Sequence, residues 1–348
     1  MPEFPEAFLQ TVRHNCDVSD ARHAGSYSLC VYLMHMREYF RWEHNLGHDA
    51  RLDSKQVGEW VAQREDRWDG LEDEDYRDLP TPAGRADPFD VEKINQWLSP
   101  LGFGYSAGIG RFGKPIFALG ELVEAEGAGD CRLICTGREW ARELISPPAM
   151  TRGQTIWIRR EALRRVLWEM IEEWRWKKPA NAMARCLSYF GFEQDASRAL
   201  ERMTEQFSEL AILHELGEKV CGDHLGEEWE RMLGDTQDRA HESILRAVRD
   251  HLADCLMVLP SLLSKENSGS VHFYFATMTG LRRQLFPALS EAYRHWVRDD
   301  ELTSLREVVR QGADHWLRRA TELLERHRSG GSHAADAAGR VTVESLAL

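Results

Sequence analysis

The sequence predicts a mainly α-helical protein, a multi-helix bundle that carries one small antiparallel β-meander. Apolar residues recur at helical spacing through most of the 348 residues. The stretch from about 104 to 137 departs from this pattern, because glycines there separate short apolar runs such as KPIFALGELVEA and CRLICTG. With 43% hydrophobic residues, including 12 Trp, the chain has enough apolar material for a sizeable core.

The first expected helix is long and covers residues 19–46. It begins at Ser19 or Asp20 as N-cap and ends at Gly47. Shorter helices are expected at about 54–68 and 91–98. Between them, acidic residues followed by LPTPAGRADP indicate a linker or surface loop over 72–88.

After the meander, a short helix is expected to end at Ser146-Pro147-Pro148, and longer helices then fill the chain. Pro287 should kink one of them. Their expected ranges are about 159–177, 180–190, 195–221, 225–233, 237–263, 271–297 and 300–328.

These elements suggest four segments. Helices over 1–73 pack into the main bundle, and 74–137 holds a linker with a small α+β insertion. The helical bundle covers 138–328. The tail over 329–348 is small and polar in composition, which predicts disorder.

Composition argues against several classes of protein. The net charge of −13 disfavours binding to nucleic acid, which requires a basic surface. The sequence contains no apolar run of about 18 residues, so we expect no membrane span. The seven cysteines form no CxxC pair, and the N-terminus lacks the features of a signal peptide. A cytoplasmic location is therefore expected.

A polar stripe follows one side of the expected 19–46 helix, which is apolar on two sides. Because buried charges must be paired or bound, two interpretations stand. Glu38 and Arg41 can neutralise each other as an internal ion pair, or the stripe lines a cavity in which Asp20, His23, Glu38 and Arg41 act as catalytic residues. The full stripe comprises Asp20, His23, Tyr27, Glu38, Arg41 and Asn45.

Two later helices direct ionisable groups toward their apolar faces. His214 and Glu218 share one helix at a spacing of one turn, and His241 and His251 lie on the next long helix. Imidazoles and carboxylates that converge inside a bundle are ligands of Fe, Mn or Zn. We therefore predict a metal site formed by these four residues. In the alternative, each histidine binds a nearby carbonyl or carboxylate and only aligns the helices.

The string HELGE resembles the zinc-protease motif only in part, since Glu218 stands where the motif needs its second histidine. Two functions remain open at this level: a metal-dependent helical enzyme with a small-molecule substrate, or a non-catalytic scaffold or partner-binding regulatory protein. The sequence leaves oligomeric state undetermined.

Overall fold

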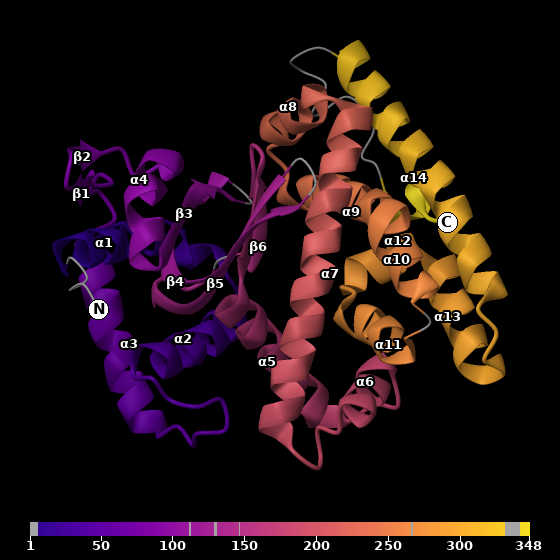
Figure 1. Ribbon diagram of the computed structural model, residues 1–348, viewed down its shortest axis with the longest axis horizontal. Coiled ribbons are helices and arrows are strands. Elements are labelled where there is room, and N and C mark those ends of the chain that lie inside the picture. Colours follow the sequence, from indigo (N-terminus) through magenta and orange to yellow (C-terminus); the bar gives the residue numbers. More distant parts are fainter. Residues whose placement is uncertain (1–5, 111–112, 129–130, 146, 266, 331–341) are drawn as a thin grey trace. The chain divides into compact units, whose positions relative to one another are not determined.

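The computed structural model describes residues 6–110, 113–128, 131–145, 147–265, 267–330 and 342–348. The chain divides into two compact units, Met1–Glu169 and Met170–Leu348 (Figure 1). The division falls within α5 (Arg160–Lys177), whereas the sequence suggested a boundary near 137. None of the helices in the described ranges combines the length and apolar character that crossing a bilayer requires.

The N-terminal unit begins with helices, and the long helix expected over 19–46 does not form. Helix α1 (Glu6–His23) starts well before that range, and a 3-10 turn (Ala24–Ser26) separates it from α2 (Leu29–Glu43). The interruption has a local cause. Gly25 disfavours helix, and Ser28 is the N-cap of α2 in an extended conformation. The expected polar stripe is therefore divided between two helices.

The remaining helices of this unit agree with expectation. Helix α3 (Ser54–Asp69) is capped by Asp53, whose side chain accepts hydrogen bonds from the amides of Lys55 and Gln56. A small hairpin of β1 (Leu79–Thr81) and β2 (Gly84–Ala86) occupies the region predicted as a loop. Helix α4 (Val91–Leu98) follows.

A five-stranded sheet replaces the predicted small meander. Strands β3 (Phe103–Ile109), β4 (Pro115–Ala128) and β5 (Cys131–Ala141) form the expected antiparallel part. Strands β6 (Ala149–Arg152) and β7 (Thr155–Arg159) extend it in the order β3-β4-β5-β7-β6. Because β5 and β7 are parallel, the sheet is mixed, and the purely antiparallel prediction is wrong on this point. The helix expected after 137 is also wrong, since β5 continues to Ala141; its expected end at Ser146 lies outside the described residues.

The sheet is curled, so that its two edge strands approach one another. Arg152 on β6 donates a hydrogen bond to the carbonyl of Ala107 on β3, over 2.6 Å. Register shifts between β4 and β5 at Leu119–Glu124 are the kind of irregularity that bends a sheet. The core of the unit lies between this sheet and helices α1 and α4, which contribute Phe8, Val12 and Ile94.

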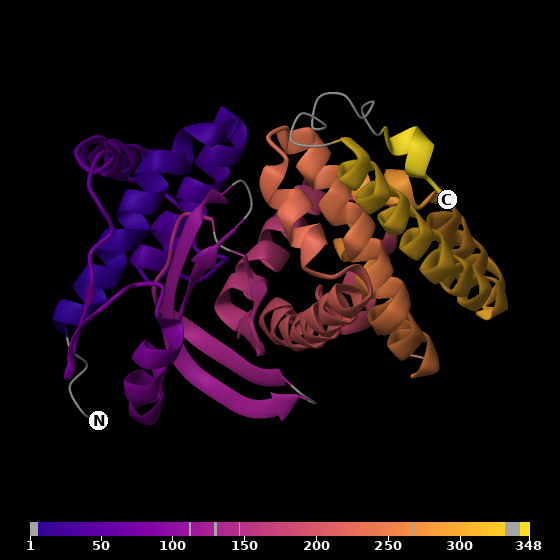
Figure 2. The same cartoon turned by 90° about the horizontal axis from the view of Figure 1, so that it is seen from above.

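The C-terminal unit is helical throughout its described part, as predicted. Figure 1 and Figure 2 show α7 (Ala196–Leu225) beside α9 (Arg239–Ala253), a pair that is in contact. The helix expected over 237–263 continues from α9 through a π-helical turn (Asp254–Val258) into α10 (Leu259–Ser264). Other members are α6 (Ala182–Phe190), α8 (Glu227–Asp235), α11 (Ser268–Thr277), α12 (Gly280–Leu285), α13 (Pro287–Asp299), α14 (Thr303–Gly330) and α16 (Val343–Leu346).

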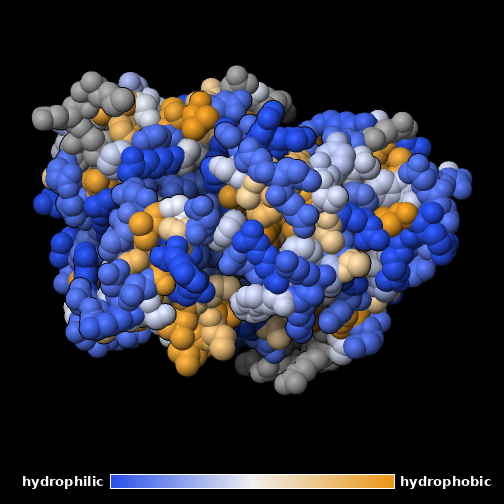
Figure 3. Space-filling view, turned by 90° about the horizontal axis from the view of Figure 1, so that it is seen from below, coloured by the Kyte–Doolittle hydropathy of each residue, from blue (hydrophilic) through white to orange (hydrophobic). Residues whose placement is uncertain are grey.

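Two predictions in this unit need correction. The range 271–297 is three helices, because Thr279 caps α12 and Pro287 starts α13, where its missing amide proton does no harm. The tail expected to be disordered is ordered over 342–348: Leu346 is buried, and the amide of Leu348 donates to the carbonyl of Leu285 over 3.1 Å. Residues 331–341 lie outside the described part. On the surface, the face in Figure 3 is mostly hydrophilic, with apolar side chains in small groups.

Candidate metal centre

The candidate centre lies where α7 and α9 approach most closely. A Cβ atom built on Gly217 of α7 would lie 2.6 Å from the carbonyl oxygen of Ala253 on α9, so only glycine fits there. On α7, His214 lies about one turn before Gly217, and Glu218 is the residue directly after it. On the segment formed by α9 and the π-helical turn, Asp250 lies about one turn before Ala253, and Asp254 is the residue directly after it. The close approach therefore brings four ionisable side chains together.

His214 is at the middle of this group, with a carboxylate facing each ring nitrogen. Its Nδ1 lies 2.7 Å from Oδ1 of Asp254. Its Nε2 lies 3.5 Å from Oε1 of Glu218 and 3.9 Å from Oδ1 of Asp250. One ligand atom from each of His214, Glu218 and Asp250 can be chosen so that all lie within 4.8 Å of one another. Each of the three side chains is half-buried.

Asp254 is held in place by further contacts. It is the first residue of the π-helical turn, a feature often found at functional sites. The hydroxyl of Tyr274 on α11 donates to its Oδ2 over 2.7 Å, and Arg282 on α12 forms an ion pair with the same oxygen. Both oxygens of Asp254 are therefore bound, and the carboxylate orients the His214 ring.

Glu218 is bound to a second arginine. Arg249 of α9 donates from Nη2 to Oε1 of Glu218 over 2.7 Å, and its Nη1 donates to Glu230 of α8 over 2.7 Å. Burial alone would raise the pKa of Glu218, but Arg249 and His214 lower it to about 2. The Glu218 carboxylate is thus ionised at neutral pH, with Oε1 held by Arg249.

Charge around His214 controls its protonation. Burial by itself would lower the pKa of His214, but Asp254, Glu218 and Asp250 together raise it well above its usual value. The pKa of Asp254 is in turn depressed: burial opposes ionisation, and Arg282 and His214 favour it more strongly. In the metal-free protein the ring is therefore an imidazolium among carboxylates.

The arrangement also has the parts of a metal centre. In metal sites, a ligating histidine usually donates its other ring N–H to a carboxylate, which fixes the tautomer and the ring orientation. Asp254 stands in that relation to His214, and Nε2 then faces Glu218 and Asp250. One imidazole and two carboxylates form a donor set that suits Mn²⁺, Fe²⁺ or Zn²⁺.

The structure brings together His214 and Glu218 from the predicted set and places the two other histidines elsewhere. His251 is fully buried, with Nε2 at 3.0 Å from the carbonyl of Arg282 and its ring stacked on Trp316. Burial and Arg282 lower the pKa of His251 to about 3, so it stays neutral. His241 lies in the first turn of α9, nine residues before Asp250 and so about 13 Å from it along the axis.

The predicted catalytic residues belong to the N-terminal unit, where each has an internal partner. Glu38 and Arg41 of α2 are buried and in contact, Nε to Oε1 at 3.1 Å, which confirms their predicted pairing. Asp20 of α1 binds Lys114 over 2.8 Å and the amide of Leu144 over 2.7 Å.

His23 contacts the Ser19 carbonyl through Nδ1 over 2.8 Å. It lies at the end of α1, on a different helix from Glu38 and Arg41. The stripe that would have aligned these residues is not continuous. A catalytic role for Asp20, His23, Glu38 and Arg41 stays a prediction.

Sequence reasoning missed Asp250 and Asp254. The predicted set rested on histidines of apolar helix faces, whereas these two aspartates lie at the edge of such a face. A usable signal was present, because Asp250 and Asp254 repeat on the second helix the four-residue spacing of His214 and Glu218. Gly217 between the latter two was a further signal of close helix contact.

The fold and the centre define a protein with a curled-sheet unit and a helical unit that carries a His/Glu/Asp group. Comparison with protein families likewise divides the chain into two domains. Residues 7–159 match the N-terminal domain, and residues 164–345 match the C-terminal domain, of a family of unknown function (DUF6866). The chain belongs to this family. No curated protein and no solved structure matches it.

Proposed function

We propose that the C-terminal unit binds one Mn²⁺, Fe²⁺ or Zn²⁺ ion through His214, Glu218 and Asp250, and that the protein is a metal-dependent enzyme. The observation that carries the proposal is the position of His214 Nε2 between two carboxylates while Asp254 holds Nδ1 at 2.7 Å. An imidazole oriented in this way is a better ligand than a freely rotating one.

The chemistry follows from the number of ligands. Three protein ligands leave at least one coordination position for water or substrate, as in catalytic rather than structural metal sites. A bound ion there would supply a Lewis acid and lower the pKa of a bound water. Arg249 and Arg282, both paired with carboxylates of the group, would add positive charge beside a substrate anion.

Elemental analysis tests the proposal directly. Protein purified without chelator should contain about one of the three metals per chain. His214→Ala and the isosteric Asp250→Asn should each reduce the metal content to background. His241→Ala is the matched control, because it removes a histidine of α9 outside the group and should leave the content unchanged.

Two outcomes would overturn the proposal. One is folded wild-type protein that contains none of the metals and, after chelator treatment and dialysis, binds none of them at micromolar concentration. The other is equal metal loss in the His241 variant and the His214 variant. Circular dichroism of each variant shows whether a lost metal reflects a lost fold.

A second candidate is a non-catalytic scaffold or partner-binding protein, and one observation favours it. The group is already electrically balanced, since imidazolium and two guanidinium groups face Glu218, Asp250 and Asp254. Such a network needs no metal to hold the helices together. Metal-free, folded protein in the analysis above would support it. A cytoplasmic location stays a prediction under either candidate.

A further inference from the structure

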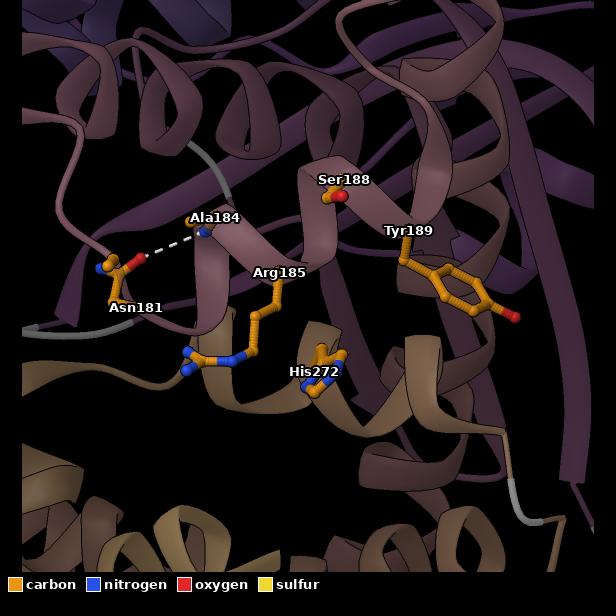
Figure 4. Close-up of a pocket in the computed structure, with 7 residues that line it drawn as sticks. Asn181, Ala184, Arg185, Ser188, Tyr189 and His272 are labelled. Carbon is orange, nitrogen blue, oxygen red and sulfur yellow. Dashed lines mark hydrogen bonds between the residues drawn. The ribbon is translucent and has the colours of Figure 1, made fainter. Parts of the chain in front are cut away.

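A second site is indicated by an open cavity at the surface between α6 and α11, which does not involve the residues of the candidate metal centre. Its volume is about 510 Å³, within the range of small-molecule pockets, which is roughly 300–1,000 Å³. Residues of α6 and of the segment before it line one side, and His272 of α11 lines the other. Figure 4 shows Arg185 and His272 near one another, with Tyr189 farther along α6.

Arg185 gives this cavity a positive charge. The lining residues include no acid. Within the described ranges, Arg185 also forms no ion pair with a carboxylate. Arg159, Arg249 and Arg282, by contrast, each pair with one. Burial, and then the charge of Arg185, lower the pKa of His272. A half-buried guanidinium that faces a cavity without a carboxylate is suited to an anionic ligand.

The contact between His272 and Tyr293 bears on the tautomer of His272. The Tyr293 hydroxyl lies 2.9 Å from Nδ1 of His272. When that hydroxyl donates to Nδ1, the ring carries its proton on Nε2. Burial and Arg185 lower the pKa of His272 to about 4, and the ring is therefore a neutral donor at neutral pH.

The rest of the lining is mostly apolar, with Asn181 and Ser188 as its two other polar side chains. Tyr189 lies against Gly269, where a Cβ would meet its ring at 2.1 Å, and its hydroxyl donates to Asn267 over 3.1 Å. These two contacts fix the ring at the edge of the cavity. Ala180 and Ala184 contribute methyl groups to the lining. The walls thus suit an apolar, flat body, and Arg185 suits a negatively charged head.

We propose that this cavity binds a small carboxylate with a flat apolar body, whose carboxylate is held by Arg185 and by the Nε2–H of His272. The guanidinium presents its donors in the fork that matches a carboxylate. Neutral His272 adds one donor without a second full charge. The proposal is independent of the metal centre, since none of its residues belongs to that group.

Equilibrium dialysis with radiolabelled benzoate tests the proposal on the full-length chain. Wild type should bind about one benzoate per chain, and Arg185→Gln should weaken binding about tenfold or more, because a charge-assisted hydrogen bond is lost. His272→Phe, which keeps a ring but removes the donor, should weaken it about three- to tenfold. Arg198→Gln, an exposed arginine of α7 outside the cavity, should leave binding unchanged.

Competition keeps the test decisive if Arg185→Gln fails to fold. In wild type, unlabelled benzoate should displace the label, whereas neutral benzamide should need at least about tenfold more. Equal competition by benzamide would show that Arg185 contributes no recognition. Equal competition by inorganic phosphate would show that the apolar walls contribute none. Either result, or full binding by folded Arg185→Gln, overturns the proposal.

Discussion

Each unit places a half-buried histidine among charged groups, but arginines dominate around His48 and carboxylates around His214. In the N-terminal unit, His48 stacks on Trp168; burial and then Arg164, Arg41 and Arg165 lower its pKa to about 4. In the C-terminal unit, carboxylates raise the pKa of His214. A metal ion can replace the proton of a histidine that faces carboxylates, whereas guanidinium groups around a histidine repel it. Only the second environment is suited to a metal.

The same difference extends to the groups around these histidines. Glu139 of β5 is surrounded by arginines: its Oε1 accepts from Nε of Arg159 over 2.6 Å, and Nη1 of Arg165 lies 3.7 Å from its Oε2. Fully buried Arg142 lies 4.0 Å away, and burial together with Arg165 lowers the pKa of Arg142 to about 10. Arginine does not give up its proton at physiological pH, so this network is fixed, while the network at His214 can exchange a proton.

The largest expected effect comes from breaking the fixed network. Glu139→Gln keeps the shape but leaves three buried arginines with less negative charge. We expect the N-terminal unit to lose about 3–5 kcal/mol of unfolding free energy. Urea titration followed by hydrogen exchange, which assigns the loss to this unit, measures it.

The control is Glu124→Gln, an exposed glutamate of the neighbouring strand β4, which should change the unfolding free energy by less than about 0.5 kcal/mol. Equal effects of the two substitutions would show that the arginine network contributes nothing beyond ordinary surface charge.

A second prediction concerns the helix contact that assembles the candidate metal centre. Gly217→Ala places a methyl group 2.6 Å from the Ala253 carbonyl, so α7 and α9 must move apart. We expect a loss of about 1–3 kcal/mol in unfolding free energy, together with weaker metal binding. Gly222→Ala, on the same helix with open space around it, should be neutral or stabilise by up to about 1 kcal/mol. Unchanged stability of Gly217→Ala would refute the close-contact argument.

These residues also show what the sequence could predict. The helices of the C-terminal unit were predicted because their apolar periodicity is long and regular, and the pair His214 and Glu218 was found from its four-residue spacing. The proximity of Asp250 could not be found in this way, because it depends on how α7 and α9 cross. The crossing includes a close contact between residues 36 positions apart, Gly217 and Ala253, at which only glycine fits.

In the N-terminal unit, tertiary pairing overrode local pattern. The sequence predicts a short helix that ends at Ser146-Pro147-Pro148, yet residues 137–141 form the end of β5, where Glu139 is buried against Arg159 of β7. The parallel pairing of β5 with β7 is non-local, and it cannot be predicted from periodicity along the chain. The break between α1 and α2 is the reverse case, because Gly25 and Ser28 are local signals in the sequence that oppose a continuous helix.

A third prediction separates the orienting role of Asp254 from a purely structural one. Asp254→Asn keeps the size of the side chain but weakens its hold on His214. We expect metal affinity to fall about 10- to 100-fold while the protein stays folded, as for other residues that orient a metal ligand. Isothermal titration of the metal-free protein with Mn²⁺ and Zn²⁺ measures the change in metal affinity.

Tyr274→Phe removes only one hydrogen bond to Asp254 and should lower the metal affinity less. Equal affinity of wild type and Asp254→Asn would contradict the assignment.

The smallest expected effect is a pH dependence in the N-terminal unit. The pKa of His48 is about 4 in the folded protein and about 6.5 in the unfolded chain. Above pH 6.5, His48 is neutral in both states and the free energy of unfolding is at its full value. As the pH falls toward 4, only the unfolded chain binds the proton, so the free energy of unfolding decreases. Because about a quarter of the side chain is exposed, 27%, we expect a loss of only about 1–2 kcal/mol in unfolding free energy between pH 7 and pH 4.

His48→Phe keeps a ring against Trp168 and cannot be protonated, so this part of the loss of stability in acid should disappear. His44→Phe, at an exposed position of the same unit, controls for the added aromatic ring. Urea midpoints measured at several pH values, with hydrogen exchange to identify the unit, give the difference. If His48→Phe and wild type lose stability in parallel between pH 7 and pH 4, arginines do not keep His48 neutral, and the contrast between the two histidine environments fails.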